Sequence, residues 1–260
     1  MISEPVTIAV IAGLGGFASG LVGVGGAIVL IPLLLYVPPL MSGIDLGIHA
    51  VTGLTAITVG AGSLTSAAGH ARRGYLSGAI VRRVGLPMVL AAAAGAVASS
   101  VLPPKILLFV FAAMATMALV LITATPKAAG AAVTDDPSSM RKSVGLGGGV
   151  GFSAGLVGAG GTFLLLPLME RFLAVPFRQA VASSVAIAFL TACASGVGKL
   201  ATAQVPLPLI VPAVLGTLAG AALGVRVSHA LPISILRFIL AAVTLIVALR
   251  SWADFFEIAG

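Results

Sequence analysis

The chain is organised around one stretch, GFASGLVGVGGAIVLIPLL at residues 16–34, which returns as GFSAGLVGAGGTFLLLPLM at residues 151–169. The two copies lie 135 positions apart and agree at 11 of 19 places. Each copy holds Gly-x-Gly-Gly inside an apolar run that is long enough to enter a bilayer, and a proline follows at Pro32 or Pro167. Glycine costs a helix interior about 1 kcal/mol relative to alanine. We therefore predict a membrane helix that is interrupted or re-entrant at its glycines, once in each half of the chain.

An interrupted helix inside a membrane leaves backbone N–H and C=O groups without intrahelical partners. Such groups are tolerated only where protein or a water-filled cavity surrounds the break. Broken helices at corresponding places of two halves are a sequence-level indicator of a transporter's binding site. The doubled stretch therefore indicates where a ligand binds as well as how the chain folds.

The composition is that of an integral membrane protein. The 260 residues have a mean hydropathy of +1.20, and 8% of them are charged, against about 25% in soluble domains. The net charge of +7 comes from basic residues scattered between apolar segments, which indicates membrane topology and no nucleic-acid partner. The single cysteine, Cys193, allows no internal disulfide, and we expect it to pack as a small apolar side chain.

The fold class that we predict is an all-α integral membrane protein with about eight transmembrane helices in two tandem four-span repeats. The expected spans are residues 6–36, 49–69, 84–101, 106–123, 144–169, 180–198, 207–225 and 233–250. The first transmembrane repeat covers residues 1–123, a polar linker that we place in the cytoplasm covers 124–142, and the second transmembrane repeat covers 143–260. A ladder of small residues at Gly216, Gly220 and Gly224 predicts close helix packing.

The orientation of the repeats depends on the glycine-rich segments. Eight simple crossings from a cytoplasmic N-terminus give parallel repeats, and the basic residues then favour both termini in the cytoplasm. If each glycine-rich segment re-enters instead of crossing, each half has an odd number of crossings and the repeats are inverted. The sequence leaves both alternatives open.

The doubled G-L-V-G-x-G-G, with HARRGYL beginning at His70, resembles the TauE/SafE sulfite exporter family over almost the whole chain. The resemblance implies a permease for a small sulfur-containing or organic anion, such as sulfite, thiosulfate or a sulfonate. It also implies a multi-pass protein of a bacterial-type plasma (inner) membrane. The second half departs from the pattern, because it reads GKLATAQV where the first half reads GHARRGYL.

The main candidates for substrate binding are six glycines of the two motifs. A half-helix that begins after each glycine pair would point its free N–H groups, and about half a positive charge, at the break. Such a helix start binds an anion without a basic side chain. The alternative is that these glycines only permit tight helix packing. The six positions are Gly23, Gly25, Gly26, Gly158, Gly160 and Gly161.

Polar side chains of the second and sixth expected spans are further candidates. Hydroxyl groups there could donate to an anion, or could bond to carbonyl groups of their own helix. These residues are Thr52, Thr55, Ser183 and Ser184. His70 and Lys199 close the same two spans, so each could extend to the membrane interface or act as a gate or coupling group.

The leading hypothesis is a secondary transporter that needs no cofactor and no metal. None of the acidic residues lies in the middle of an apolar run, which argues against a cation site and fits an anion carrier. An anion channel of the same fold is the alternative. A membrane enzyme is a third hypothesis, but we identify no catalytic residue, because neither Ser19 nor Ser195 has the glycine two places before the serine that intramembrane serine proteases favour. The expected partners are a small inorganic or organosulfur anion and the lipid bilayer, and the sequence leaves a homodimer open.

Overall fold

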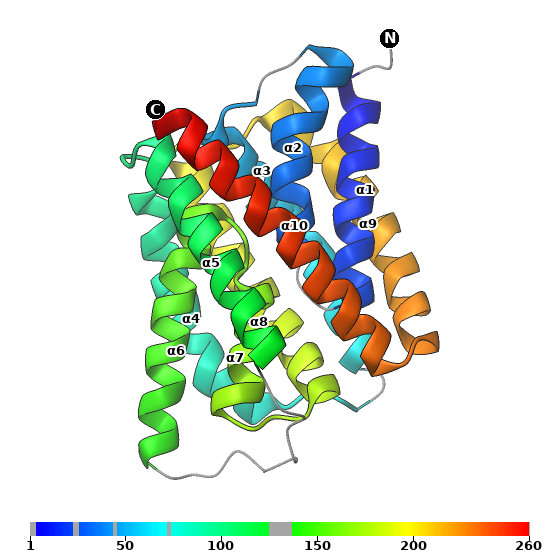
Figure 1. Cartoon of the computed structure of the whole chain (residues 1–260), viewed down its shortest axis with the longest axis vertical. Coiled ribbons are helices and arrows are strands. Elements are labelled where there is room, and N and C mark those ends of the chain that lie inside the picture. The colour runs from blue at the N-terminus through cyan, green and yellow to red at the C-terminus, as the bar shows by residue number, and fades with distance from the viewer. Residues whose placement is uncertain (1–3, 23–25, 44–45, 72–73, 125–136, 260) are drawn as a thin grey trace.

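The computed structural model describes residues 4–22, 26–43, 46–71, 74–124 and 137–259, and these residues form a bundle of helices (Figure 1). Every regular element within those ranges is an α-helix, which confirms the predicted fold class. The five helices of the first half are α1 (Glu4–Val22), α2 (Ala27–Ser42), α3 (Ile48–Ala71), α4 (Gly78–Ala98) and α5 (Pro104–Ala124). Those of the second half are α6 (Pro137–Val157), α7 (Thr162–Phe172), α8 (Phe177–Ala201), α9 (Leu207–Ala230) and α10 (Ile233–Ala259).

Most of these helices match one expected span each. In the described residues, seven helices are long and apolar enough to cross a membrane, namely α1, α3, α4, α5, α8, α9 and α10. Shorter apolar stretches lie in α2 and α6, and α7 has only 11 residues. The two glycine-rich spans, residues 6–36 and 144–169, are each divided into two helices, so the predicted interruption is confirmed in both halves.

Each divided span folds back on itself as a helical hairpin. A Cβ atom built on Gly15 of α1 would lie 3.0 Å from Leu30 Cβ of α2, although the break between the two helices separates these residues along the chain. In the second half, a Cβ atom on Gly161 would lie 2.9 Å from Ala154 Cβ and 3.0 Å from Val150 Cγ1. The two helices of each pair are therefore antiparallel, and α2 and α7 return toward the end of the molecule where α1 and α6 began.

The helix directions favour the inverted alternative. In Figure 1, α1 descends from the N-terminus at the upper end, α6 ascends from the lower end, and the C-terminus lies at the upper end. With five helices in each half, the start of α1 and the start of α6 lie at opposite ends. A cytoplasmic N-terminus together with a cytoplasmic linker, which eight simple crossings would allow, does not fit this arrangement.

The expected linker is shorter in the structure than in the sequence prediction. Residues 125–136 lie outside the described ranges, but α6 already begins at Pro137. Proline is favoured in the first turn of a helix, because its missing N–H would have no intrahelical partner there. The last six residues of the predicted linker, 137–142, therefore lie in the first turns of α6.

The two halves exchange their first helices. α1 packs mainly on α9, and α6 packs mainly on α4. Cβ atoms built on Gly216, Gly220 and Gly224 would lie 2.0, 2.0 and 2.2 Å from backbone oxygens of α1, so α9 and α1 are in backbone contact. The predicted small-residue ladder is therefore a packing surface.

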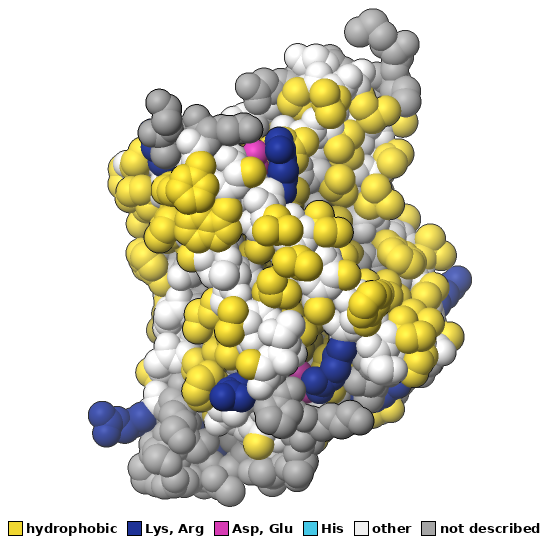
Figure 2. Space-filling model, in the orientation of Figure 1, with side chains coloured by type: hydrophobic (Ala, Val, Ile, Leu, Met, Phe, Trp, Pro, Cys, Tyr) yellow, Lys and Arg dark blue, Asp and Glu magenta, His cyan; other side chains and the backbone are white. Residues whose placement is uncertain are grey.

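The long helices α3 and α8 form the centre of the bundle. They contact each other, and 67% of each apolar span is buried, more than in the other long helices. Cys193 on α8 is exposed, so the expectation that its side chain packs inside is wrong. Figure 2 shows hydrophobic side chains over the middle of the visible face, with most Lys and Arg side chains toward its lower end.

Candidate functional site

The two breaks are formed by glycines in the left-handed region of backbone conformation. Gly26 has φ 72° before α2, and Gly158, Gly160 and Gly161 have φ 69°, 62° and 69° before α7. A Cβ atom on Gly158 would lie 2.0 Å from Thr52 O, so this position requires glycine both for its φ and for its space. The other two predicted glycines, Gly23 and Gly25, lie outside the described residues.

The start of α7 lies deep inside the bundle. Gly160 approaches Val59 and Ala188, which stand near the middle of α3 and α8. The N–H groups of Leu164 and Leu165 both donate to Gly161 O, which begins the helix. The N–H groups before them have no intrahelical partner and point out of the helix start, where the macrodipole adds about half a positive charge. This helix start can therefore bind an anion at mid-depth.

A second observation at this helix start also indicates a ligand. Thr162, the first residue of α7, is completely buried, and its hydroxyl has no hydrogen-bond partner among the described residues. A buried hydroxyl without a partner costs about 1–3 kcal/mol. Its donor is available to a bound anion. The sequence prediction did not include Thr162, although it directly follows the Gly-x-Gly-Gly of the second motif, where Ala27 stands in the first.

Two further buried serines share this property. The hydroxyls of Ser19 on α1 and Ser63 on α3 have no hydrogen-bond partner in the described part of the chain. A Cβ atom on Gly62 would lie 3.6 Å from Ser19 Oγ, so Ser19 reaches the middle of α3. Ser63 lies one helical turn beyond Val59, which contacts the second break. Available hydroxyls thus lie near both breaks, and only the tertiary structure identifies them.

Most of the hydroxyl groups predicted from the sequence as ligands are buried, but they already donate hydrogen bonds to carbonyl oxygens of their own helices. Thr52 Oγ1 donates to His49 O at 3.0 Å, and Thr55 Oγ1 donates to Val51 O at 2.7 Å. Ser184 Oγ donates to Val181 O at 3.0 Å. These donors follow the alternative in which a helical hydroxyl bonds to its own helix.

Ser183 differs from these residues, because its Oγ accepts the N–H of Ser77 at 3.3 Å. The contact joins the start of α8 to the residue just before α4. Ser183 is completely buried. In this contact the Ser183 oxygen is an acceptor, so its hydroxyl proton remains a candidate donor.

Lys199 does not extend to the membrane interface. Its side chain is completely buried at the end of α8. Its three N–H donors share four acceptors within hydrogen-bond distance of Nζ: Thr52 Oγ1, Ser99 Oγ, Gln204 Oε1 and Leu156 O, at 3.1, 2.9, 3.2 and 3.1 Å. All four acceptors are neutral oxygens, and Leu156 belongs to the last turn of α6, next to the break. The lysine therefore lies beside the second glycine motif.

His70 occupies the related place in the first half. It is buried at the end of α3 and lines a small cavity with Leu21, which corresponds to Leu156 in the doubled motif. Tyr75 and Arg178 line the same cavity, with the Arg178 guanidinium 5.9 Å from the Tyr75 ring centre. The cavity volume is about 10 Å³, room for about one water. The cavity beside His70 is therefore too small for an anion such as thiosulfate in this structure.

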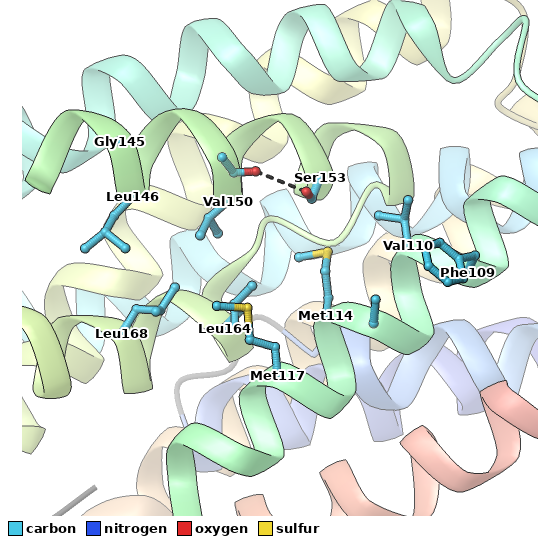
Figure 3. Close-up of a pocket in the computed structure, with 12 residues that line it drawn as sticks. Phe109, Val110, Met114, Met117, Gly145, Leu146, Val150, Ser153, Leu164 and Leu168 are labelled. Atoms are coloured by element: carbon cyan, nitrogen blue, oxygen red, sulfur yellow. Dashed lines mark hydrogen bonds between the residues drawn. The ribbon is translucent and has the colours of Figure 1, made fainter. Parts of the chain in front are cut away.

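Two larger hollows between the described helices do not contain this chemistry. One hollow of about 430 Å³ lies between α5, α6 and α7, where Met114, Met117 and Leu164 point into it (Figure 3). Its hydroxyl, Ser153, donates to Gly149 O at 3.0 Å. A second hollow, of about 660 Å³, lies between α1 and α9 and is also lined by apolar side chains. Apolar hollows of this kind suit lipid chains better than an anion.

The described residues contain no group of three His, Cys, Asp or Glu side chains that could hold a metal ion. Glu170, the buried carboxylate of α7, is instead paired with Arg237 of α10. The Arg237 guanidinium also lies 4.8 Å from the ring centre of Phe177. This pair fixes the outer end of α7, about two turns or more from the helix start.

Comparison with known protein families gives one match. The family described as Sulfite exporter TauE/SafE matches residues 8–251 of this chain, which include both glycine motifs, all of α2 to α9 and most of α1 and α10. No curated protein and no solved structure matches.

Proposed function

Because the chain belongs to the TauE/SafE sulfite exporter family, a family of membrane transporters, we propose that it is a secondary carrier for a small sulfur-containing or organic anion. Sulfite, thiosulfate and sulfonates are the substrate class. The anion binds at the start of α7, between the central helices α3 and α8. Backbone N–H groups and the hydroxyl of Thr162 are its donors.

One observation carries this proposal. The first turn of α7 begins at mid-depth behind three left-handed glycines, and the Thr162 hydroxyl at this start is buried without a partner among the described residues. A helix start attracts anions, and a free buried donor beside it needs an acceptor. An oxyanion supplies several acceptor oxygens to both kinds of donor. Hydrogen bonds to a charged group are roughly twice as strong as those between neutral groups.

The charges around the breaks support an anion over a cation. Lys199 lies beside the second break, whereas the carboxylate of Glu170 lies at the far end of α7 and is paired with Arg237. A carboxylate at the helix start would repel an anion. The breaks therefore combine helix dipoles, free hydroxyls and one ammonium group, all of which favour negative charge.

The internal duplication supports a carrier mechanism. Transporters with inverted repeats bind substrate at the interface of the repeats and open alternately to the two sides of the membrane. In this chain α3 and α8, one from each half, pack together at the position of the breaks. A small relative movement of the halves would expose the start of α7 to one side at a time.

The test is anion flux in liposomes that contain the purified protein. We expect uptake of radiolabelled sulfite or thiosulfate that saturates and shows counterflow, with taurine, sulfoacetate and sulfate as competitors. Gly26→Leu and Gly161→Leu should each abolish flux, because their Cβ atoms would lie 2.3 Å from Gly15 O and 2.6 Å from Met88 Cε. The control is Gly145→Leu on α6, where a Cβ atom has nothing within 4 Å.

Two results would contradict the proposal in different ways. Flux that does not saturate and reaches rates near diffusion would identify an anion channel. Normal saturable flux in both glycine variants would exclude the broken helices as the binding site. The Gly145→Leu control separates a specific effect at the breaks from the general cost of adding a leucine to a glycine-rich helix.

A further inference from the structure

A helix that is broken inside a membrane has two ends to satisfy. The start of α7 carries a partial positive charge, and the carboxyl end of α6 carries a partial negative charge and carbonyl groups without intrahelical partners. In broken-helix transporters, such carboxyl ends and the neighbouring unwound carbonyls coordinate a coupling cation such as Na⁺. The carboxyl end of α6 is therefore the place where a bound cation is expected.

The ammonium group of Lys199 occupies this place. It donates at 3.1 Å to the carbonyl of Leu156, in the last turn of α6. Its other acceptors are the hydroxyls of Thr52 and Ser99 and the side-chain amide oxygen of Gln204. One carbonyl, two hydroxyls and one amide oxygen are also the kind of oxygen ligands that a hard metal cation takes.

The ammonium group has no opposite charge beside it. All four acceptors are neutral, and within the described ranges no carboxylate forms an ion pair with Lys199, whose side chain is completely buried. A buried cation normally needs a counter-charge. The adjoining site can supply one, since Leu156 stands two residues before Gly158, and Thr52 contributes both the hydroxyl that binds Nζ and the carbonyl against Gly158.

We propose that Lys199 is a resident cation that replaces a bound Na⁺ at the second break and supplies the positive charge against which the anion binds. The inference rests on the proposed function and adds its ion requirement. Anion binding then needs no Na⁺. The first half has His70 at the related place, and the cation that lines its cavity is the guanidinium of Arg178 from the start of α8, so the two breaks differ in the kind of basic group beside them.

The experiment measures anion binding by the purified protein, as the rise in unfolding temperature with increasing thiosulfate or sulfite, in Na⁺ and in choline buffers. We expect the wild type to bind equally in both. In choline, Lys199→Met should weaken binding about tenfold or more, through loss of a nearby charge. Lys199→Ala removes the charge and leaves the four oxygens with free space, so Na⁺ should restore part of its affinity.

The matched control is Lys105→Met, which removes an exposed lysine at the same end of the molecule and should bind as the wild type does. The inference is overturned if wild-type binding requires Na⁺, if Lys199→Met binds as tightly as the wild type, or if Na⁺ leaves the affinity of Lys199→Ala unchanged. The wild-type comparison stands even if both variants fail to fold. A wild type that binds no anion in either buffer contradicts the proposed function itself, so the two failures are distinguishable.

Discussion

Single backbone conformations decide where the two membrane hairpins turn. At Gly158 a side chain would meet both a left-handed φ of 69° and the carbonyl oxygen of Thr52 at 2.0 Å. We expect Gly158→Ala to lower the unfolding free energy by about 1–3 kcal/mol from backbone strain alone, and to abolish anion flux. Thermal unfolding in detergent measures the first effect. Gly145→Ala is the control, and equal stability of the two variants would exclude a strained turn at Gly158.

Removing the hydroxyl of Thr162 should have opposite effects on the stability of the ligand-free protein and on its affinity for the anion. Thr162→Val removes a buried donor that has no partner among the described residues, so the ligand-free protein should become slightly more stable. Anion affinity should fall about five- to tenfold, the equivalent of one hydrogen bond of about 1–1.5 kcal/mol. The control is Thr123→Val, which removes an exposed hydroxyl that donates to Leu119 O of its own helix, α5. This variant should change neither the stability nor the anion affinity. Unchanged affinity in Thr162→Val would remove this residue from the site.

At the scale of single residues, the sequence predicted the breaks, but it did not single out the buried hydroxyls of Thr162, Ser19 and Ser63, which have no partner among the described residues. A Gly-x-Gly-Gly inside an apolar run is a local signal, and the structure has left-handed glycines at Gly26, Gly158, Gly160 and Gly161. Whether a hydroxyl is free depends on neighbours that are distant in sequence. Thr55 met the pattern of a ligand, yet its donor is used by Val51 O.

Among the helices, α7 is the shortest and is held at both of its ends. Its start is fixed by glycines, and its end by the ion pair between Glu170 and Arg237. Arg237→Met would leave the buried carboxylate of Glu170 unpaired, so we expect a loss of about 3 kcal/mol in unfolding free energy. Adding Glu170→Gln to this variant should recover much of the loss. Arg226→Met, which removes an exposed arginine of α9, is the control, and a loss there of similar size would argue against the ion pair as the cause.

The sequence predicted the positions of most helices, but it did not decide whether the two glycine-rich spans cross the membrane or turn back as hairpins. Residues 144–169 contain no charged side chain, so their composition is equally compatible with a straight membrane helix and with a helix that turns back. Only contacts such as that of Gly161 with Val150 distinguish the two. The same limit explains Lys199, since a lysine at a helix end reaches the interface unless other helices cover it, and here α3, α4 and α6 do.

The molecule as a whole has one strongly basic end. Seven described arginines belong to the end where α6, α8 and α10 begin: Arg82, Arg83, Arg141, Arg171, Arg178, Arg226 and Arg237. Two of these arginines contact other helices or loops at this end: Arg171 donates to Ala124 O, and the Arg178 guanidinium lies over the Tyr75 ring. The exposed or half-exposed basic residues described at the other end are Lys105 and Arg250, beside the aromatic cluster of Phe109, Trp252 and Phe256. By the excess of basic residues on the cytoplasmic side of membrane proteins, we expect the basic end to face the cytoplasm.

It follows that both chain termini face away from the cytoplasm, opposite to the orientation that eight simple crossings favour. We expect alkaline phosphatase fused to the C-terminus to be active in cells, and green fluorescent protein at the same place to be dark. Insertions of the two reporters within residues 125–136 should give the reverse pattern. A fluorescent C-terminal fusion would reject the inverted arrangement of five helices in each half.

The exchange of first helices between the halves has a consequence for how such a protein is made and how it arose. α1 leaves the ribosome first but lacks its main neighbour until α9 has been synthesised, so the N-terminal half cannot mature alone. A half-length ancestor would have needed to insert into the membrane in both orientations. Two oppositely oriented copies could then have packed the first helix of each copy against the other copy, as α1 and α6 do here. Two separately expressed halves should therefore assemble only when they enter the membrane upside down relative to each other.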